Sequence, residues 1–169
     1  MAVSDSRDPA DADNRTEDYG RALKSATGML SRRQHAVREL ETKLLARFDR
    51  ETVAGVIGRL GELGYLDDEA FAREYARQRF SRSPRSALAV TTELEARGVD
   101  RTVAQYAVAA VLEDEGLSDE LLAEKAACKK LAILGTADLE KNKAKVGRFL
   151  ASRGFSRAAV YVTIKKILD

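Results

Sequence analysis

The sequence has few of the residues on which metal sites, disulfide frameworks and sheets depend. Its 169 residues include one cysteine, one histidine, two prolines and no tryptophan. A single cysteine, Cys128, excludes an internal disulfide framework. His35 has no second histidine and only one distant cysteine to join it, so the sequence argues against a zinc site. We therefore expect no metal and no cofactor, and we expect Cys128 to be an ordinary packed or half-packed helix residue.

Recognisable catalytic and nucleotide-binding motifs are also missing. The sequence has no GxxxxGK[ST] or GxGxxG segment, so nucleotide binding is not indicated. His35 has no identifiable nucleophile and orienting acid to work with, and we expect it at the start of a surface helix. Neither a secretory h-region in the first nineteen residues nor a run of about 18 apolar residues is present. We therefore expect a cytoplasmic protein without membrane contact.

The residues that are abundant favour helices. Ala, Leu, Arg and Glu dominate, proline is nearly absent, and no run alternates polar with β-branched residues as a strand would. Because charged residues make up 33% of the chain, it needs wide solvated faces. The sequence predicts an all-α fold.

Three segments end one helix and start the next in the same way. Residues 46–50, 97–101 and 153–157 each place an apolar residue before an Asp or Ser that can cap the following helix. The three caps, Asp49, Asp100 and Ser156, are 51 and 56 residues apart. A period of this length that ends in helix, turn and helix predicts a tandem helical repeat. Such repeats form long surfaces that bind macromolecules.

The repeat divides the chain into three predicted units after an acidic tail. Residues 1–18 form the tail, which we expect to be disordered, and the three-helix units cover residues 19–66, 67–116 and 117–169. The first helix is expected over 21–30. In the second unit, Ser83–Pro84 is expected to start the middle helix. Ser118 is expected to start the third unit.

Charge is distributed unevenly along the chain. Residues 1–19 contain six acids and two arginines, whereas residues 117–169 contain eleven basic and six acidic groups. The tail either screens the basic body or only aids solubility. In the third unit, Lys141, Lys145 and Arg148 form one stripe of a helix, which Arg153 and Arg157 extend. This bias suits phosphates or an acidic protein surface, although a solvated face is the alternative.

A second basic face lies on the helix that follows residue 67. Glu69 lies four residues before Arg73 and pairs with it, whereas Arg77 has no acid at that spacing and is expected to be freer to meet a partner. Contact with a partner and plain solvation remain equal alternatives for this face.

The segment Gly64-Tyr65-Leu66-Asp67-Asp68 separates the first two units. Two adjacent carboxylates would suit metal binding or acid–base chemistry. Their position at the start of a helix favours N-capping instead. We expect Tyr65 and Leu66 to pack this turn against the core. Phe71 and Tyr75 are expected on the buried face of the next helix.

Residues 64–77, GYLDDEAFAREYAR, resemble the central motif of the RecX family, regulators of the RecA recombinase. Arg32-Arg33 followed by Glu39-Leu40 and Lys43-Leu44 resembles the family's first unit. Residues 94–99 and 150–156 resemble its later helix ends. Two departures suggest a looser first unit: Ala36 stands where the family usually has a serine cap, and the closure at 46–50 lacks glycine.

The resemblance implies nine helices in three tandem three-helix units that form an elongated, curved array. It also implies a monomeric, non-enzymatic protein that binds the RecA filament on single-stranded DNA and inhibits recombinase and co-protease activity. Such a regulator acts in DNA repair, recombination and the SOS response. Turn-linked helices and a basic third unit would also suit a helical module that binds nucleic acid directly. The chain lacks aromatic residues suited to stacking on bases, so any direct DNA contact is expected to be weak and without base reading.

Overall fold

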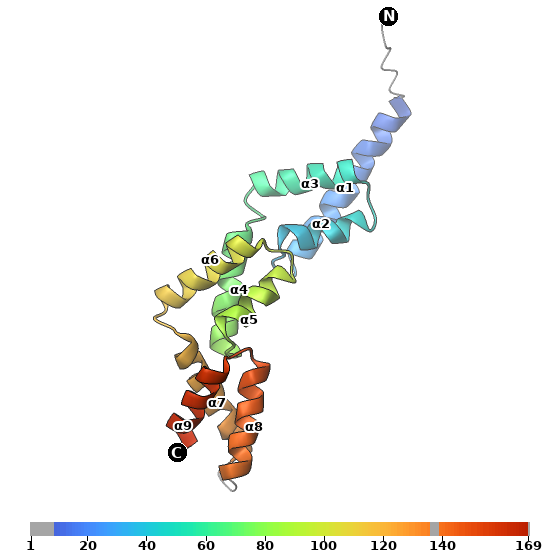
Figure 1. Ribbon diagram of the computed structural model, residues 1–169. Helices are drawn as coiled ribbons and strands as arrows, with labels where there is room; N and C mark the ends of the chain where they lie inside the picture. The colour runs from blue at the N-terminus through green and yellow to red at the C-terminus, as the bar shows by residue number, and fades with distance from the viewer. Residues whose placement is uncertain (1–8, 136–138, 169) are drawn as a thin grey trace, which may run out of the picture. The chain divides into compact units, whose positions relative to one another are not determined.

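The computed structural model describes residues 9–135 and 139–168 of the chain (Figure 1). These residues form α-helices joined by short turns, with no strand among them, so the predicted all-α fold is confirmed. The helices are α1 (Pro9–Leu30), α2 (Val37–Leu45), α3 (Arg50–Glu62), α4 (Asp68–Arg82), α5 (Ala87–Glu95), α6 (Arg101–Asp114), α7 (Asp119–Leu134), α8 (Leu139–Ser152) and α9 (Arg157–Leu168).

The chain divides into two compact units, and the division falls inside α4, between Phe71 and Ala72. In the first unit α1 packs against both α2 and α3. The buried core of this unit consists of small and branched apolar residues: Ala22, Ala26, Leu40, Leu44, Val53, Val56, Leu60 and Leu66. The alanines belong to α1 and allow it to approach its neighbours closely.

Helix α1 begins earlier than the sequence predicts. It starts at Pro9, so residues 9–18 are helical and the expectation of a disordered tail is wrong for them. Two contacts join the first half of α1 to α3. The Tyr19 ring packs close to Gly55 of α3, since a Cβ added to Gly55 would lie 3.4 Å from it. Arg15 Nη1 lies 3.4 Å from Glu51 Oε2. Apolar periodicity within α1 alone does not reveal these contacts. Residues 1–8 of the predicted tail lie outside the described residues.

The second compact unit contains most of α4 and helices α5 to α9. Helix α5 packs against α6, and α7, α8 and α9 pack against one another (Figure 1). Each group has its own buried apolar side chains, with Val90, Leu94 and Val111 in the first and Leu122, Val146 and Leu150 in the second.

The expected caps are present at most helix starts. Asp49, Asp100 and Ser156 each accept a hydrogen bond from a backbone N–H in the first turn of the following helix, as predicted. Ser118, where the third unit was expected to start, makes the same bond at the start of α7. Each bond satisfies a donor that the helix leaves without an intrahelical partner.

The prediction that Ser83–Pro84 starts the middle helix of the second unit is wrong. The Ser83 N–H still bonds to the Arg79 carbonyl at 3.0 Å, so Ser83 closes the last turn of α4. Helix α5 begins at Ala87, and its cap is Ser86, whose Oγ accepts from the Ala89 N–H at 3.1 Å.

Candidate interaction surface

The turn between α3 and α4 is built around Gly64. This residue has φ +72°, and the following N–H, that of Tyr65, bonds to the Leu60 carbonyl at 2.9 Å, which is the Schellman end of a helix. Leu66 is buried in the core of the first unit, as expected. Tyr65 is 64% exposed, so the expectation that it packs against the core is wrong. The Schellman bond orients Leu66 inward and leaves Tyr65 in solvent.

The two aspartates of this segment serve different helices. Asp67 caps α4, because its Oδ1 accepts from the Ala70 N–H at 2.9 Å. Asp68 Oδ1 instead accepts from the N–H of Val37, the first residue of α2, at 2.9 Å. This bond lies at the helix start where Ala36 offers no side-chain acceptor. Both carboxylates therefore have structural roles, and Phe71 behind them is buried, as predicted.

Arg73 and Arg77 both face the end of α6. Arg73 Nη1 lies 3.7 Å from Asp114 Oδ2, and its guanidinium lies 5.5 Å from the centre of the Tyr106 ring. Arg77 contacts the same Asp114 at 3.8 Å and Glu115 at 3.7 Å. Arg77 therefore has acidic neighbours, which come from the end of another helix and not from α4. Its side chain is nevertheless more exposed than that of Arg73, at 44% against 25%. Contact of this face with a partner stays a prediction.

The basic stripe of α8, Lys141, Lys145 and Arg148, is exposed, as the sequence predicts. The opposite face of the helix is buried through Asn142, Val146 and Leu150. Arg157, the first residue of α9, is also exposed. These four cations are accessible to a partner, and their use in binding stays a prediction.

Arg153, unlike the exposed cations of α8 and Arg157, is half-buried and contributes to packing. Its guanidinium lies 4.9 Å from the centre of the Phe149 ring and donates a hydrogen bond to Ser83 Oγ. Its carbonyl accepts from the Ser86 N–H at 3.1 Å. Burial, followed by the charges of Arg85 and Arg79, lowers the pKa of Arg153. The α8–α9 turn is thereby tied to the start of α5.

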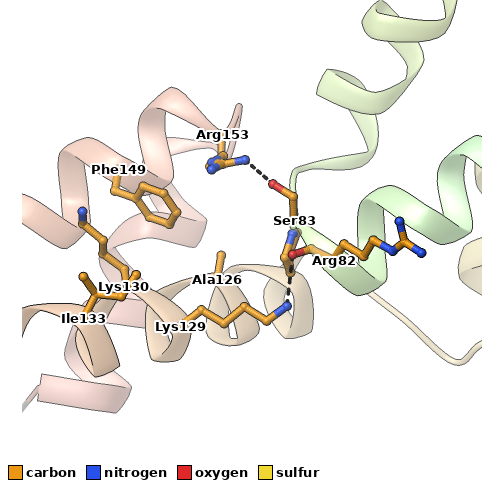
Figure 2. Close-up of a pocket in the computed structure, with 9 residues that line it drawn as sticks. Arg82, Ser83, Ala126, Lys129, Lys130, Ile133, Phe149 and Arg153 are labelled. Atoms are coloured by element: carbon orange, nitrogen blue, oxygen red, sulfur yellow. Dashed lines mark hydrogen bonds between the residues drawn. The ribbon is translucent and has the colours of Figure 1, made fainter.

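A hollow of about 200 Å³ opens beside Arg153, between the end of α4, α7 and α8 (Figure 2). Four cations line it: Arg82, Lys129, Lys130 and Arg153. Its apolar lining includes Phe149 and Ile133, and Ile133 is 80% exposed. Of this lining only Arg153 was predicted from sequence as a binding residue, because the other residues come from distant parts of the chain and share no motif. The one visible signal was the pair Lys129-Lys130 followed by the apolar Ile133.

His35 is not on a surface helix, so that expectation is wrong. It precedes α2 and is only 6% exposed, with Nδ1 3.0 Å from the Arg33 carbonyl oxygen and Nε2 3.2 Å from Lys43 Nζ. Burial lowers the pKa of His35. Glu39 lies beside it and accepts hydrogen bonds from Arg33 and Lys43. Chiefly through the Arg33 bond, the pKa of Glu39 falls to about 2.

Cys128 is exposed on α7, so the expectation that it is packed or half-packed is wrong. Across residues 9–135 and 139–168, no three or more His, Cys, Asp or Glu side chains are grouped as a metal site would require. None of the helices described combines the length and the apolar character needed to cross a membrane.

Family comparisons match the second and third predicted units. A family model described as "RecX, second three-helix domain" matches residues 67–108, and one described as "RecX, third three-helix domain" matches residues 119–162. A protein named "Regulatory protein RecX" from Chlorobaculum tepidum is 33% identical over 87% of this chain and 88% of its own length. A protein of the same name from Thermus thermophilus is 35% identical over 79% of this chain and 83% of its own length.

Solved structures agree on the fold. A crystal structure of RecX from Lactobacillus salivarius superposes with a TM-score of 0.72 at 19% identity, over 90% of this chain and 97% of that one. A second, titled "regulatory protein RecX", gives a TM-score of 0.74 at 20% identity, over 98% of this chain and 83% of that one. The helices and their repeated caps define an all-α repeat protein. The chain belongs to the RecX family of regulatory proteins.

Proposed function

We propose that this protein regulates the RecA recombinase without catalysis, by binding the RecA filament on single-stranded DNA and inhibiting recombinase and co-protease activity. Membership of the RecX family carries the proposal. The segment 64–77, with its two structural aspartates, is the part of the chain that most resembles the family's central motif. Through this activity the protein would act in DNA repair, recombination and the SOS response, in the cytoplasm and as a monomer.

The electrostatics of α8 and α9 support binding to a charged filament. The basic stripe Lys141, Lys145 and Arg148 is exposed to solvent on a helix whose other face is buried. Exposed charges raise the rate of association with a surface of opposite sign. DNA phosphates and acidic protein side chains would both provide such a surface.

Comparing two forms of the same DNA tests the proposal. The full chain is titrated against single-stranded DNA coated with RecA and against the bare strand, while ATP hydrolysis and strand exchange by RecA are followed. We expect tighter binding to the coated strand together with loss of both activities.

The same titration addresses the alternative function. The basic stripe would also suit a helical module that binds nucleic acid directly. Equal affinity for coated and bare strands, with RecA activities unchanged, would replace the regulator proposal with that module.

A further inference from the structure

We propose that the hollow beside Phe149 is a docking site for an acidic segment of a partner protein, and that this segment inserts one apolar side chain. The inference deepens the proposed function and rests on it, because the segment would belong to the protein that this chain regulates.

Charge is the first argument for an acidic partner. Arg82, Lys129, Lys130 and Arg153 line the hollow, and no carboxylate lines it. Among the described residues, no ion pair involves any of these four cations. The neighbouring arginines behave differently, since Arg79 and Arg85 share Glu93 at 2.8 and 2.9 Å. The hollow therefore gathers four positive charges that have no ion pair among the described residues, which favours an anionic partner.

Two of these cations are already oriented by the protein. Lys129 Nζ donates to the Ser81 carbonyl at 2.8 Å, at the end of α4, and Arg153 donates to Ser83 Oγ. Cations held in this way lose little freedom when they meet a carboxylate, so less of the interaction energy goes into ordering them. Lys130 lies 5.5 Å from the centre of the Phe149 ring and is the third cation held against the hollow.

The apolar lining is the second argument. Ile133 leaves 80% of its surface in water and lies in the same hollow as Phe149. An apolar side chain of the partner would cover both, with a gain proportional to the apolar area removed from water. The hollow is smaller than the roughly 300–1,000 Å³ of most small-molecule pockets. Its volume of about 200 Å³ suits a single inserted side chain better than a cofactor or nucleotide.

The geometry favours protein over nucleic acid as the occupant. Single-stranded nucleic acid binds aromatic platforms by stacking a base on an open ring. In Figure 2, Lys130 and Arg153 approach the Phe149 ring from different sides, at 5.5 and 4.9 Å from its centre. A stacking base would have to displace one of them. Phosphates alone would engage the cations but leave Ile133 exposed.

Peptide binding to the full chain tests the site directly. The probe is a short fluorescein-labelled peptide of glutamates around one central leucine, followed by fluorescence anisotropy. Comparators are the same peptide with serine in place of leucine, and labelled oligothymidylate. We expect Lys130→Glu and Ile133→Ser each to weaken binding of the leucine peptide by about tenfold, or about 1.4 kcal/mol. Lys125→Glu makes the same charge change on α7 outside the hollow and should have little effect.

Equal affinity for the leucine and serine peptides would overturn the proposal, because the apolar insertion would be absent. It would also be overturned if the two variants lost oligothymidylate binding while keeping peptide binding, which would identify a nucleic-acid site. Circular dichroism of each variant shows whether a loss comes from unfolding.

Filament binding separates this inference from the proposed function. The double variant Lys130→Glu, Ile133→Ser should bind RecA-coated DNA more weakly than wild type. If it loses the peptide but binds the filament normally, the hollow is not the docking site and the regulator proposal still stands. If wild type selects the leucine peptide but does not bind the filament, the site is supported and the regulator proposal fails.

Discussion

Asp119 accepts a hydrogen bond from the backbone N–H of Ala87, 32 residues earlier, at 2.8 Å. Asp68 makes the equivalent bond to Val37, 31 residues earlier, at 2.9 Å. In both cases the first residue of one helix satisfies the first N–H of the helix two before it. The first four N–H groups of a helix have no intrahelical acceptor. The two aspartates are 51 residues apart, close to the period of the sequence repeat. The first helix of the second and of the third predicted three-helix unit therefore caps the middle helix of the preceding three-helix unit.

Removing either carboxylate should lower stability by a cap-sized amount. We expect Asp68→Ala and Asp119→Ala each to reduce the free energy of unfolding by about 1–2 kcal/mol. Asp→Asn at the same position keeps an oxygen acceptor and should recover most of the loss. Urea denaturation followed by circular dichroism measures the difference. Equal losses for Ala and Asn would show that the charge and not the hydrogen bond is responsible.

Gly154 is expected to be intolerant of any side chain. It has φ +84°, and a Cβ there would lie 2.7 Å from Ala89 Cβ and 2.8 Å from Ser86 Oγ. Left-handed strain and the clash together predict that Gly154→Ala costs about 2–4 kcal/mol. Gly116 has φ +59° and nothing within 4 Å of its Cβ position, so Gly116→Ala measures strain alone. Thermal unfolding that showed equal losses for the two variants would contradict the proposed close contact.

The Glu39 cluster should make stability depend on pH. Because the pKa of Glu39 is lowered from 4.5 to about 2 in the folded chain, the ionised form stabilises the fold above its unfolded pKa. This contribution is lost as the pH falls from 4.5 towards about 2. Burial lowers the pKa of His35, so neutral His35 adds stability that is lost below its ordinary value of 6.5.

Glu39→Gln tests this dependence. It should cost about 1–3 kcal/mol at neutral pH, since it removes charge-assisted hydrogen bonds. The gap between wild type and variant should narrow as the pH falls below 4.5. Glu41→Gln on the same helix is the control, because Glu41 forms no ion pair among the described residues. Urea titrations at several pH values supply the measurement, and a gap that stayed constant would exclude the carboxylate as its source.

Reversing the charges of the basic stripe with Lys141→Glu, Lys145→Glu and Arg148→Glu should weaken filament binding and leave the helical content unchanged. The side chains are exposed, so their charges are screened by salt. Wild type should lose affinity as ionic strength rises, and the triple variant should show a shallower slope. The matched control reverses three exposed arginines of the first unit, Arg32, Arg38 and Arg47. Identical slopes for wild type and the α8 variant would remove this stripe from the interface.

Features that depend on neighbouring residues were predictable from sequence. A cap such as Asp49 or Asp100 bonds within three residues of itself, so the signal lies in one short segment. The buried face of α8 follows from the spacing of Val146 and Leu150. The all-α fold follows from the same local patterns repeated along the chain.

Features that depend on long-range contacts were not predictable. Arg77 looked unpaired because its acids, Asp114 and Glu115, lie more than thirty residues away at the end of α6. His35 looked exposed between polar neighbours, yet packing of the first unit buries it. The proline after Ser83 favours Ser83 as the cap of the middle helix, whereas the structure uses Ser86, whose N–H bonds to the distant Arg153 carbonyl.

The Ser86 N–H, which donates to the Arg153 carbonyl, is suited to hydrogen-exchange measurements of local opening. Ser86 is 1% exposed, and its amide proton has no acceptor within its own helix. That proton should exchange with solvent deuterium only when the α8–α9 turn lifts away from α5. Its exchange rate would therefore measure the free energy of one local opening event, separately from global unfolding. A single amide resonance would then report when the last three helices detach from the preceding ones.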